Sequence, residues 1–352
     1  MDVHAHLADP SFSGKEDELL EQAFASGVAA VVAVAEGADD CDTLAKMAAA
    51  RFASASAAGA PPSCGLGVCL GLHPVQVGLD GAWRSAEAAD VGPVLARLRA
   101  HASAPWLVGV GEVGLDFCPR TLSSRPGLTA EQVKEEQRQV LREQVRAARR
   151  LGLPLNVHSR SAGHHAVTLL AEEGAGLGAT APAPGTHGDA TGRELLRAGA
   201  AASEADADDA AADGGEADSG GAGSAGLGTG AAGSRTGSGG PGAVLHAFDG
   251  RARFVREGVE RGFFFSVPPS AARSPVVRKW LPHCPLDRLL LETDSPALPE
   301  VKGAVNTPAC AAASLRLVAE ALGRTEEEVA AATTANALRL MPRLAALMPP
   351  AV

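Results

Sequence analysis

Short runs of apolar residues recur along the chain, separated by longer and more polar stretches. The runs are continuous rather than alternating, which is typical of parallel strands buried on both faces. Eight such runs occur, at 1–4, 28–35, 65–74, 106–116, 153–160, 243–248, 262–269 and 286–296. They predict a parallel sheet of eight strands.

The segments between these runs carry apolar residues at helical spacing. The clearest pattern spans 129–152, and similar ones cover 15–27, 86–102 and 325–340. The last of these opens with Thr325 and Glu328, which fit a capping box at the start of a helix. Strands followed by helices, repeated in series, predict an α/β fold, a (β/α)₈ TIM barrel. In this fold the carboxyl ends of all strands meet at one rim.

One long segment does not fit this alternation. Residues from about 175 to 240 are mostly Ala, Gly, Ser, Asp and Pro, with few large apolar side chains. Such a composition buries too little apolar area to offset the entropy of ordering the chain. We therefore predict a single hydrolase domain over 1–352, interrupted at about 175–240 by a disordered insertion.

Charge and cysteine content narrow the class of protein. The net charge is −10, but seven acidic residues lie at 201–220, so the rest of the chain is only mildly acidic. There is no overall basic footprint, so any contact with nucleic acid must be local or made through metal ions. The chain has no apolar run of membrane length, no signal segment and no C-x-x-C pair among its cysteines. These features predict an intracellular protein, cytoplasmic or nuclear, with reduced thiols and no membrane partner.

Polar side chains stand at the ends of the predicted strands. The chain begins MDVHAHL, and His4 and His6 project from one face of the first strand. An isolated pair of imidazoles is weak evidence for a metal, but further candidates end other strands: Glu112, His158, His246 and Asp294. All six would converge on the rim where TIM barrels carry their chemistry. The set is too large for one tetrahedral ion. Shared by a bridging Glu112, it suits two metal ions about 3.5–4 Å apart.

Eight motifs, in order and over nearly the whole chain except about 175–240, resemble the TatD family of metal-dependent deoxyribonucleases. They are MDVHAHL, GLHPVQ, GEVGLDF, EEQRQVLREQ, LPLNVHSRSA, VLHAFDG, LLLETDSPAL and TTANALRL. Within the family, GLHPVQ, NVHSRSAG, LHAFDGR and FFSVPPS look most similar to the third animal-type branch. Ser161, Asp249 and Phe117 stand where members often have an acid, a serine and a tyrosine. None of these three is a candidate ligand.

The resemblance implies a TIM barrel of the amidohydrolase type with a divalent metal centre. Its cofactors would be two divalent cations, and four imidazoles favour zinc or manganese over a site built for magnesium. Magnesium stays open, because family members are often assayed with it. By motif, the implied ligands are His4, His6 and Asp294 for one metal, His158 and His246 for the second, and Glu112 as the bridge.

Three more side chains at the predicted rim are assigned by position. His73 could contact a substrate phosphate or pack before Pro74. Arg160 could hold a phosphate through bidentate contact or pair with a loop acid, and we favour the phosphate. Asp116 is expected to hydrogen-bond a ligand histidine and orient it. The three tryptophans are expected to be core or surface anchors rather than platforms for bases.

Together these features predict a hydrolase acting on ester bonds, a deoxyribonuclease that trims ends of single-stranded DNA. A metal-bound hydroxide would attack phosphorus, with Glu112 holding the metals and Asp294 accepting the proton of the water. Two alternatives remain open. The same barrel could hydrolyse a small amide, lactone or phosphoester, because fold does not fix substrate. It could also be a non-catalytic metal-binding module, although the intact ligand set argues against this.

Overall fold

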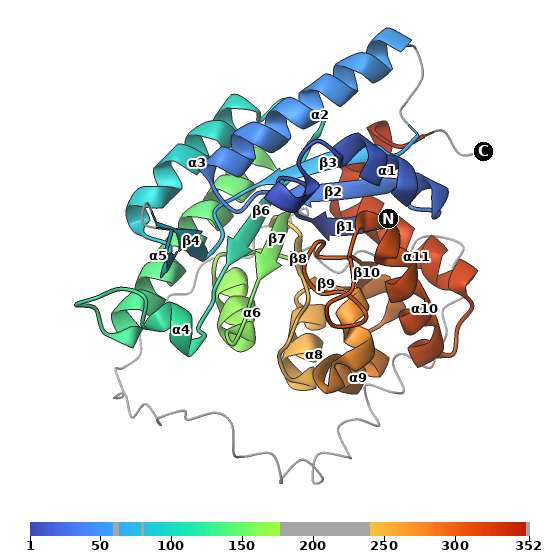
Figure 1. Ribbon diagram of the computed structural model, residues 1–352. Coiled ribbons are helices and arrows are strands. Elements are labelled where there is room, and N and C mark those ends of the chain that lie inside the picture. The colour runs from blue at the N-terminus through green and yellow to red at the C-terminus, as the bar shows by residue number, and fades with distance from the viewer. Residues whose placement is uncertain (59–62, 79–80, 177–239, 350–352) are drawn as a thin grey trace, which may run out of the picture. The chain divides into compact units, whose positions relative to one another are not determined.

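The computed structural model describes all residues except 59–62, 79–80, 177–239 and 350–352. An 8-stranded sheet runs in the order β1-β2-β3-β6-β7-β8-β9-β10, and all its pairings are parallel (Figure 1). Each predicted apolar run overlaps one of these strands, which confirms the prediction. Their bounds are β1 (Asp2–Ala5), β2 (Ala30–Val34), β3 (Gly65–Leu70), β6 (Leu107–Gly114), β7 (Leu155–His158), β8 (Ala243–Leu245), β9 (Phe264–Val267) and β10 (Leu289–Leu291).

The sheet closes on itself between β10 and β1. Ala5 forms a parallel bridge with Ser295, just past the end of β10. Deeper in the barrel wall, the buried carboxylate of Asp2 accepts hydrogen bonds from the backbone N–H of Thr293 (2.9 Å) and from its hydroxyl (2.6 Å). The fold is therefore a TIM barrel, as the strand pattern predicted.

Helices follow the strands and surround the sheet (Figure 1). The four predicted helices are present as α1, α3, α5 and α11, and the capping box of Thr325 and Glu328 is formed. On α5 the apolar stripe that faces the barrel is buried. The helices are α1 (Glu16–Ala25), α2 (Ala38–Ala58), α3 (Ala88–Ala100), α4 (Pro119–Leu122), α5 (Ala130–Leu151), α6 (Gly163–Glu172), α8 (Ala252–Glu260), α9 (Pro275–Trp280), α10 (Ala311–Leu322) and α11 (Glu326–Leu340).

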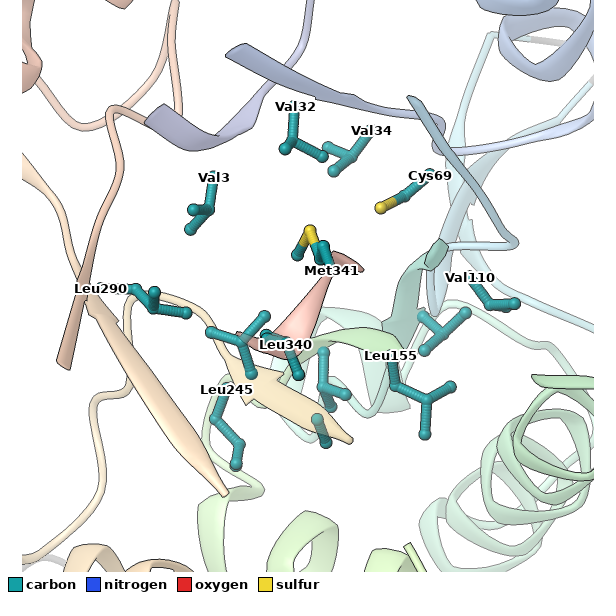
Figure 2. Close-up of a cluster of buried hydrophobic side chains, with 14 of the residues drawn as sticks. Val3, Val32, Val34, Cys69, Val110, Leu155, Leu245, Leu290, Leu340 and Met341 are labelled. Carbon is teal, nitrogen blue, oxygen red and sulfur yellow. The ribbon is translucent and has the colours of Figure 1, made fainter. Parts of the chain in front are cut away.

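The end of the chain packs where the strands begin. Figure 2 shows Leu340 and Met341, at the end of α11, among apolar side chains of the barrel strands. The short helix after them, Pro342–Ala346, lies against β3 and β6. There Arg343 donates a 2.9 Å hydrogen bond to the carbonyl of Leu107, the first residue of β6. This packing closes one end of the barrel and leaves the opposite end for polar chemistry.

A small hairpin between β3 and α3 was not predicted. Its strands, β4 (Val75–Val77) and β5 (Trp83–Ser85), pair antiparallel beside the carboxyl end of β3. They are short, and both Val77 and Trp83 are exposed, so no buried apolar pattern marks them in the sequence.

The predicted insertion at about 175–240 lies almost wholly outside the described residues. The residues that flank it meet directly, because the N–H of Gly176 donates to the carbonyl of Pro241 over 2.9 Å. The segment therefore leaves the end of α6 and returns just before β8, at the start of a strand. The single-domain organisation stays a prediction.

All six cysteines are free. Within the described part of the chain, no helix is both long and apolar enough to cross a membrane.

Candidate metal centre

The barrel brings all six predicted ligands to its open end. His4 lies in β1, Glu112 in β6, and His158 is the last residue of β7. His6, His246 and Asp294 follow β1, β8 and β10. Their nitrogen and oxygen atoms form overlapping groups in which every atom lies within 4.8 Å of the others, an arrangement that could hold metal ions.

The first cluster contains His4, His6, Asp294 and one oxygen of Glu112. His6 Nε2 lies 3.1 Å from Asp294 Oδ1 and 3.3 Å from His4 Nε2. Glu112 Oε2 lies 3.4 Å from His4 Nε2 and 3.5 Å from His6 Nε2. Two imidazoles and two carboxylates thus direct atoms toward one point.

The second cluster gathers around the other oxygen of Glu112. Oε1 lies 2.7 Å from His246 Nε2, 2.9 Å from His158 Nδ1 and 3.6 Å from His73 Nε2. The nitrogens of His158 and His246 are themselves 3.3 Å apart. The two oxygens of one buried carboxylate therefore face two adjoining groups of imidazoles, which meet where the rings of His4 and His246 stack at 3.8 Å.

These separations fit metal ligands. Atoms bound at about 2.1 Å in a tetrahedron around zinc lie about 3.4 Å apart, and the neighbouring nitrogens in both clusters are 3.3 Å apart. Imidazole nitrogens and carboxylate oxygens are also the donors that divalent transition metals prefer. The residues present therefore fit divalent metal ions.

The pKa values of the clustered histidines also support metal binding. Burial disfavours the imidazolium of His4, but Glu112 outweighs it and raises the pKa of His4 to about 10. Asp116 and Glu112 likewise overcome burial and raise the pKa of His158 to about 9. At His246 burial prevails, together with the charge of His4, and lowers the pKa to about 4. The carboxylates thus keep His4 and His158 protonated at neutral pH, on the nitrogens that would bind cations. Metal binding at neutral pH must therefore release these protons.

Asn156 orients His4, a role that the sequence analysis missed. His4 Nδ1–H donates to Asn156 Oδ1 over 2.9 Å, and Asn156 Nδ2 donates to the carbonyl of Val3 over 2.9 Å. This contact leaves Nε2 of His4 free to face the cluster. The signal was available in LPLNVH, because Asn156 lies two residues before His158 and therefore on the same face of β7.

Glu292 is a second missed residue, two positions before Asp294. Its carboxylate is fully buried and accepts hydrogen bonds from Ser266 Oγ (2.6 Å) and the N–H of Ala247 (2.8 Å). Burial raises its pKa to about 8. Glu292 Oε2 lies 3.8 Å from His246 Nδ1, so it stands behind that imidazole.

Glu36 is the third missed residue, just past the end of β2. Its carboxylate lies within 4.8 Å of ligand atoms of His6 and Glu112, and its side chain is exposed. Its backbone is fixed, because its N–H donates to Asp40 Oδ2 (3.1 Å) and its carbonyl accepts from the N–H of His73 (2.9 Å). A charged residue directly after the apolar run VAVA was the available signal.

The remaining predicted residues also lie at this end of the barrel. His73 belongs to the second cluster, where burial lowers its pKa, so its phosphate contact stays a prediction. Asp116 Oδ2 lies 3.5 Å from His158 Nε2, the position predicted for an orienting carboxylate. Arg160 is exposed and forms no ion pair with a described carboxylate.

Unusual backbone geometry accompanies the strand ends. Asp294 (φ 51°), Ala247 (φ 42°) and Ser161 (φ 53°) adopt left-handed conformations that residues with a side chain rarely take. At Gly114 the φ is +152°, and a Cβ there would lie 2.0 Å from the carbonyl oxygen of His158. Strained conformations of this kind cluster at functional sites.

Fold and site together define a TIM barrel of the amidohydrolase type. The family model described as TatD related DNase matches residues 1–342, and the chain belongs to that family. It is 34% identical over 348 residues to human deoxyribonuclease TATDN3, covering 99% of this chain and 96% of that protein. It is 27% identical over 348 residues to the 3'-5' ssDNA/RNA exonuclease TatD of Cronobacter turicensis, covering 96% of both chains. The TatD homologue YJJV of Escherichia coli has a similar solved structure, with a TM-score of 0.64, 22% identity and 97% of each chain covered.

Proposed function

We propose that the protein is a metal-dependent deoxyribonuclease that hydrolyses phosphodiester bonds and removes nucleotides from the ends of single-stranded DNA. The observation that carries this proposal is the placement of Glu112 Oε2 and Oε1 against two adjoining imidazole clusters, one around each oxygen. It supports two divalent cations of zinc, manganese or magnesium, one held by His4, His6 and Asp294, the other by His158 and His246. Family membership and the names of the relatives support DNA as the substrate.

Bound cations would acidify a water molecule and neutralise charge on the phosphate. Glu112 supplies the anionic oxygens shared by both clusters. Asp294 is the group that accepts the proton of the attacking water. Burial would raise its pKa, but His6 and His4 outweigh burial and hold the pKa below its usual value. Its carboxylate is therefore ionised at neutral pH and able to take a proton.

Other rim residues position the substrate and the ligands. We assign His73 and Arg160 to the reacting phosphate, and Asp116 to the orientation of His158. The proposal also includes one hydrolase domain over 1–352 with its insertion at about 175–240, and a location in the cytoplasm or nucleus. The lack of disulfides supports the location.

The test is an assay on end-labelled single-stranded DNA after removal of metal by chelation. We expect no turnover until a divalent cation is added, stepwise release of mononucleotides, and two ions per chain by elemental analysis. A panel of small amides, lactones and phosphoesters is assayed in parallel. Hydrolysis of a panel member without cleavage of DNA in any metal would replace the proposal with the small-substrate alternative.

A further inference from the structure

Four exposed arginines lie on the segments that follow three neighbouring strands. Arg120 lies in α4 after β6, Arg160 follows β7, and Arg251 and Arg253 stand at the start of α8 after β8. Among the described residues, none of the four has a carboxylate within ion-pair distance, whereas Arg84, nearby, is held by Asp90. Two of the four pack on aromatic rings instead, Arg120 on Trp83 and Arg253 on Phe254.

These arginines border the second cluster. The same three strands supply Glu112, His158 and His246, and Figure 1 shows α4, α6 and α8 in succession at one end of the barrel. The segments also touch, since Cys118 Sγ lies 3.6 Å from Ser161 Oγ. The N–H of Ser161 in turn donates to Asp249 over 3.5 Å. Positive charge therefore lies along one side of the barrel mouth, beside two acids of the described residues, Asp116 and Asp249.

An exposed tryptophan stands at one end of this series. Trp83, in the hairpin, is 57% exposed, whereas Trp106 and Trp280 are 5% and 0% exposed. The guanidinium carbon of Arg120 lies 4.3 Å from the centre of the Trp83 ring. An exposed indole beside a cation is the kind of platform on which proteins stack unpaired bases. A stacking role for Trp83 would depart from the expectation that all three tryptophans are core or surface anchors.

We propose that Arg120, Arg251, Arg253 and Trp83, here called the basic band, bind the part of a single-stranded nucleic acid that extends beyond the reacting phosphate, which Arg160 contacts. The arginines contact successive phosphates, and Trp83 stacks on a base. A duplex hides the faces of its bases, so stacking selects a single strand. This inference rests on the proposed function, because it describes how the substrate of that site is held.

Binding of a labelled oligothymidylate, followed by fluorescence anisotropy over a salt series, tests the basic band without turnover. The variant Arg120→Gln/Arg251→Gln/Arg253→Gln should bind about tenfold more weakly at low salt. Its plot of log affinity against log salt should be less steep by about 2, since each phosphate contact to a single strand contributes about 0.7. The control Lys46→Gln/Arg99→Gln removes exposed cations outside the band and should leave affinity and slope unchanged.

Tryptophan fluorescence tests the contribution of the Trp83 ring by itself. Oligothymidylate should quench the tryptophan fluorescence of the parent protein, and Trp83→Leu should abolish the quenching. A triple variant with the parental affinity and slope, or quenching that survives in Trp83→Leu, would overturn the basic band. Duplex bound as tightly as single strand would overturn it as well.

Hydrolysis of bis(p-nitrophenyl) phosphate separates this inference from the proposed function. The triple variant should lose far more activity on the oligonucleotide than on this small diester. If the triple variant loses the same fraction of parental activity on both substrates, and cleavage still depends on metal, the basic band is refuted and the proposed nuclease function stands. A parent protein that binds oligothymidylate through these residues but cleaves no phosphodiester refutes the nuclease and supports the band.

Discussion

Glu112 is the residue on which both clusters depend, and Glu112→Gln should abolish hydrolysis and weaken metal binding. A glutamine offers one neutral oxygen where the carboxylate directs Oε1 and Oε2 to different groups of imidazoles. It also removes the charge that raises the pKa of His4 and His158. Turnover on single-stranded DNA and metal content by elemental analysis measure the effect. Turnover within tenfold of the parent, about 1.4 kcal/mol in activation free energy, would exclude Glu112 as a bridge.

A matched control is Glu320→Gln, which makes the same change at an exposed position in α10, outside both clusters. It should leave turnover and metal content unchanged. A loss in this control would mean that the assay reports general damage rather than the site.

Asp294→Asn should keep the fold and much of the metal but lose most of the turnover. Asparagine is among the few residues that accept the left-handed backbone found at Asp294, so the variant changes chemistry rather than conformation. The histidines and Glu112 remain to hold cations, but an amide cannot accept the proton of the water. Single-turnover rates near neutral pH, measured with metal content and melting temperature, test this role. A single-turnover rate equal to that of the parent would mean that another group accepts the proton of the water.

The six proposed ligands could be found from the sequence because each stands at the end of an apolar strand. The supporting residues were harder to find, because their roles depend on neighbouring strands. Asn156 contacts His4 of β1, and Glu292 lies behind His246, which follows β8. Both are two residues before a proposed ligand, so strand parity could have pointed to them, but not to the partners they meet.

At the scale of elements, strands buried on both faces were predictable and small exposed ones were not. Continuous apolar runs mark all eight barrel strands, because burial on both faces removes any polar alternation. The hairpin of β4 and β5 has three residues in each strand and an exposed Trp83, so nothing in its pattern distinguishes it from a loop. The hairpin bears on the proposed basic band because it carries Trp83 beside the carboxyl end of β3, a position that only the fold shows.

The junction of β6 and β7 depends on Gly114, and Gly114→Ala should destabilise the protein by more than about 3 kcal/mol. The new Cβ would lie 2.0 Å from the carbonyl oxygen of His158 and would have to move the end of β7. Metal binding should weaken too, because His158 belongs to the second cluster. Chemical denaturation with and without metal measures both effects.

Gly152→Ala is the control for this substitution. Gly152 ends α5 with φ +63°, and a Cβ there meets nothing within 4 Å. Gly152→Ala should lower the free energy of unfolding by only about 1–2 kcal/mol, the cost of a side chain in a left-handed backbone. It should leave metal affinity unchanged. Equal losses in the two variants would show that the contact with His158 is not what requires glycine.

At the scale of the whole molecule, the barrel divides its tasks between two ends. Apolar packing of the chain terminus closes the end where the strands begin, with Arg343 bonded to the start of β6. The proposed ligands, the hairpin and the residues of the proposed basic band lie at the other end. Substitutions in the terminal segment should therefore act on stability first, and substitutions at the mouth should act on chemistry.

The insertion offers a test of that division. Replacing 177–239 by a short Gly-Ser-Gly linker should leave both folding and DNA turnover in place. Gly176 and Pro241, on either side, are already joined by a 2.9 Å hydrogen bond, so a short link can reconnect α6 to β8. The segment enters β8 at its start, away from the strand ends that carry the ligands, and every proposed ligand lies outside it. Loop-closure entropy changes slowly, by about 0.6 kcal/mol for each doubling of length, so shortening should be neutral or slightly stabilising. Melting temperature and turnover on single-stranded DNA, compared with the full chain, give the result. A collapse of either would show that this segment contributes to the core or to substrate binding.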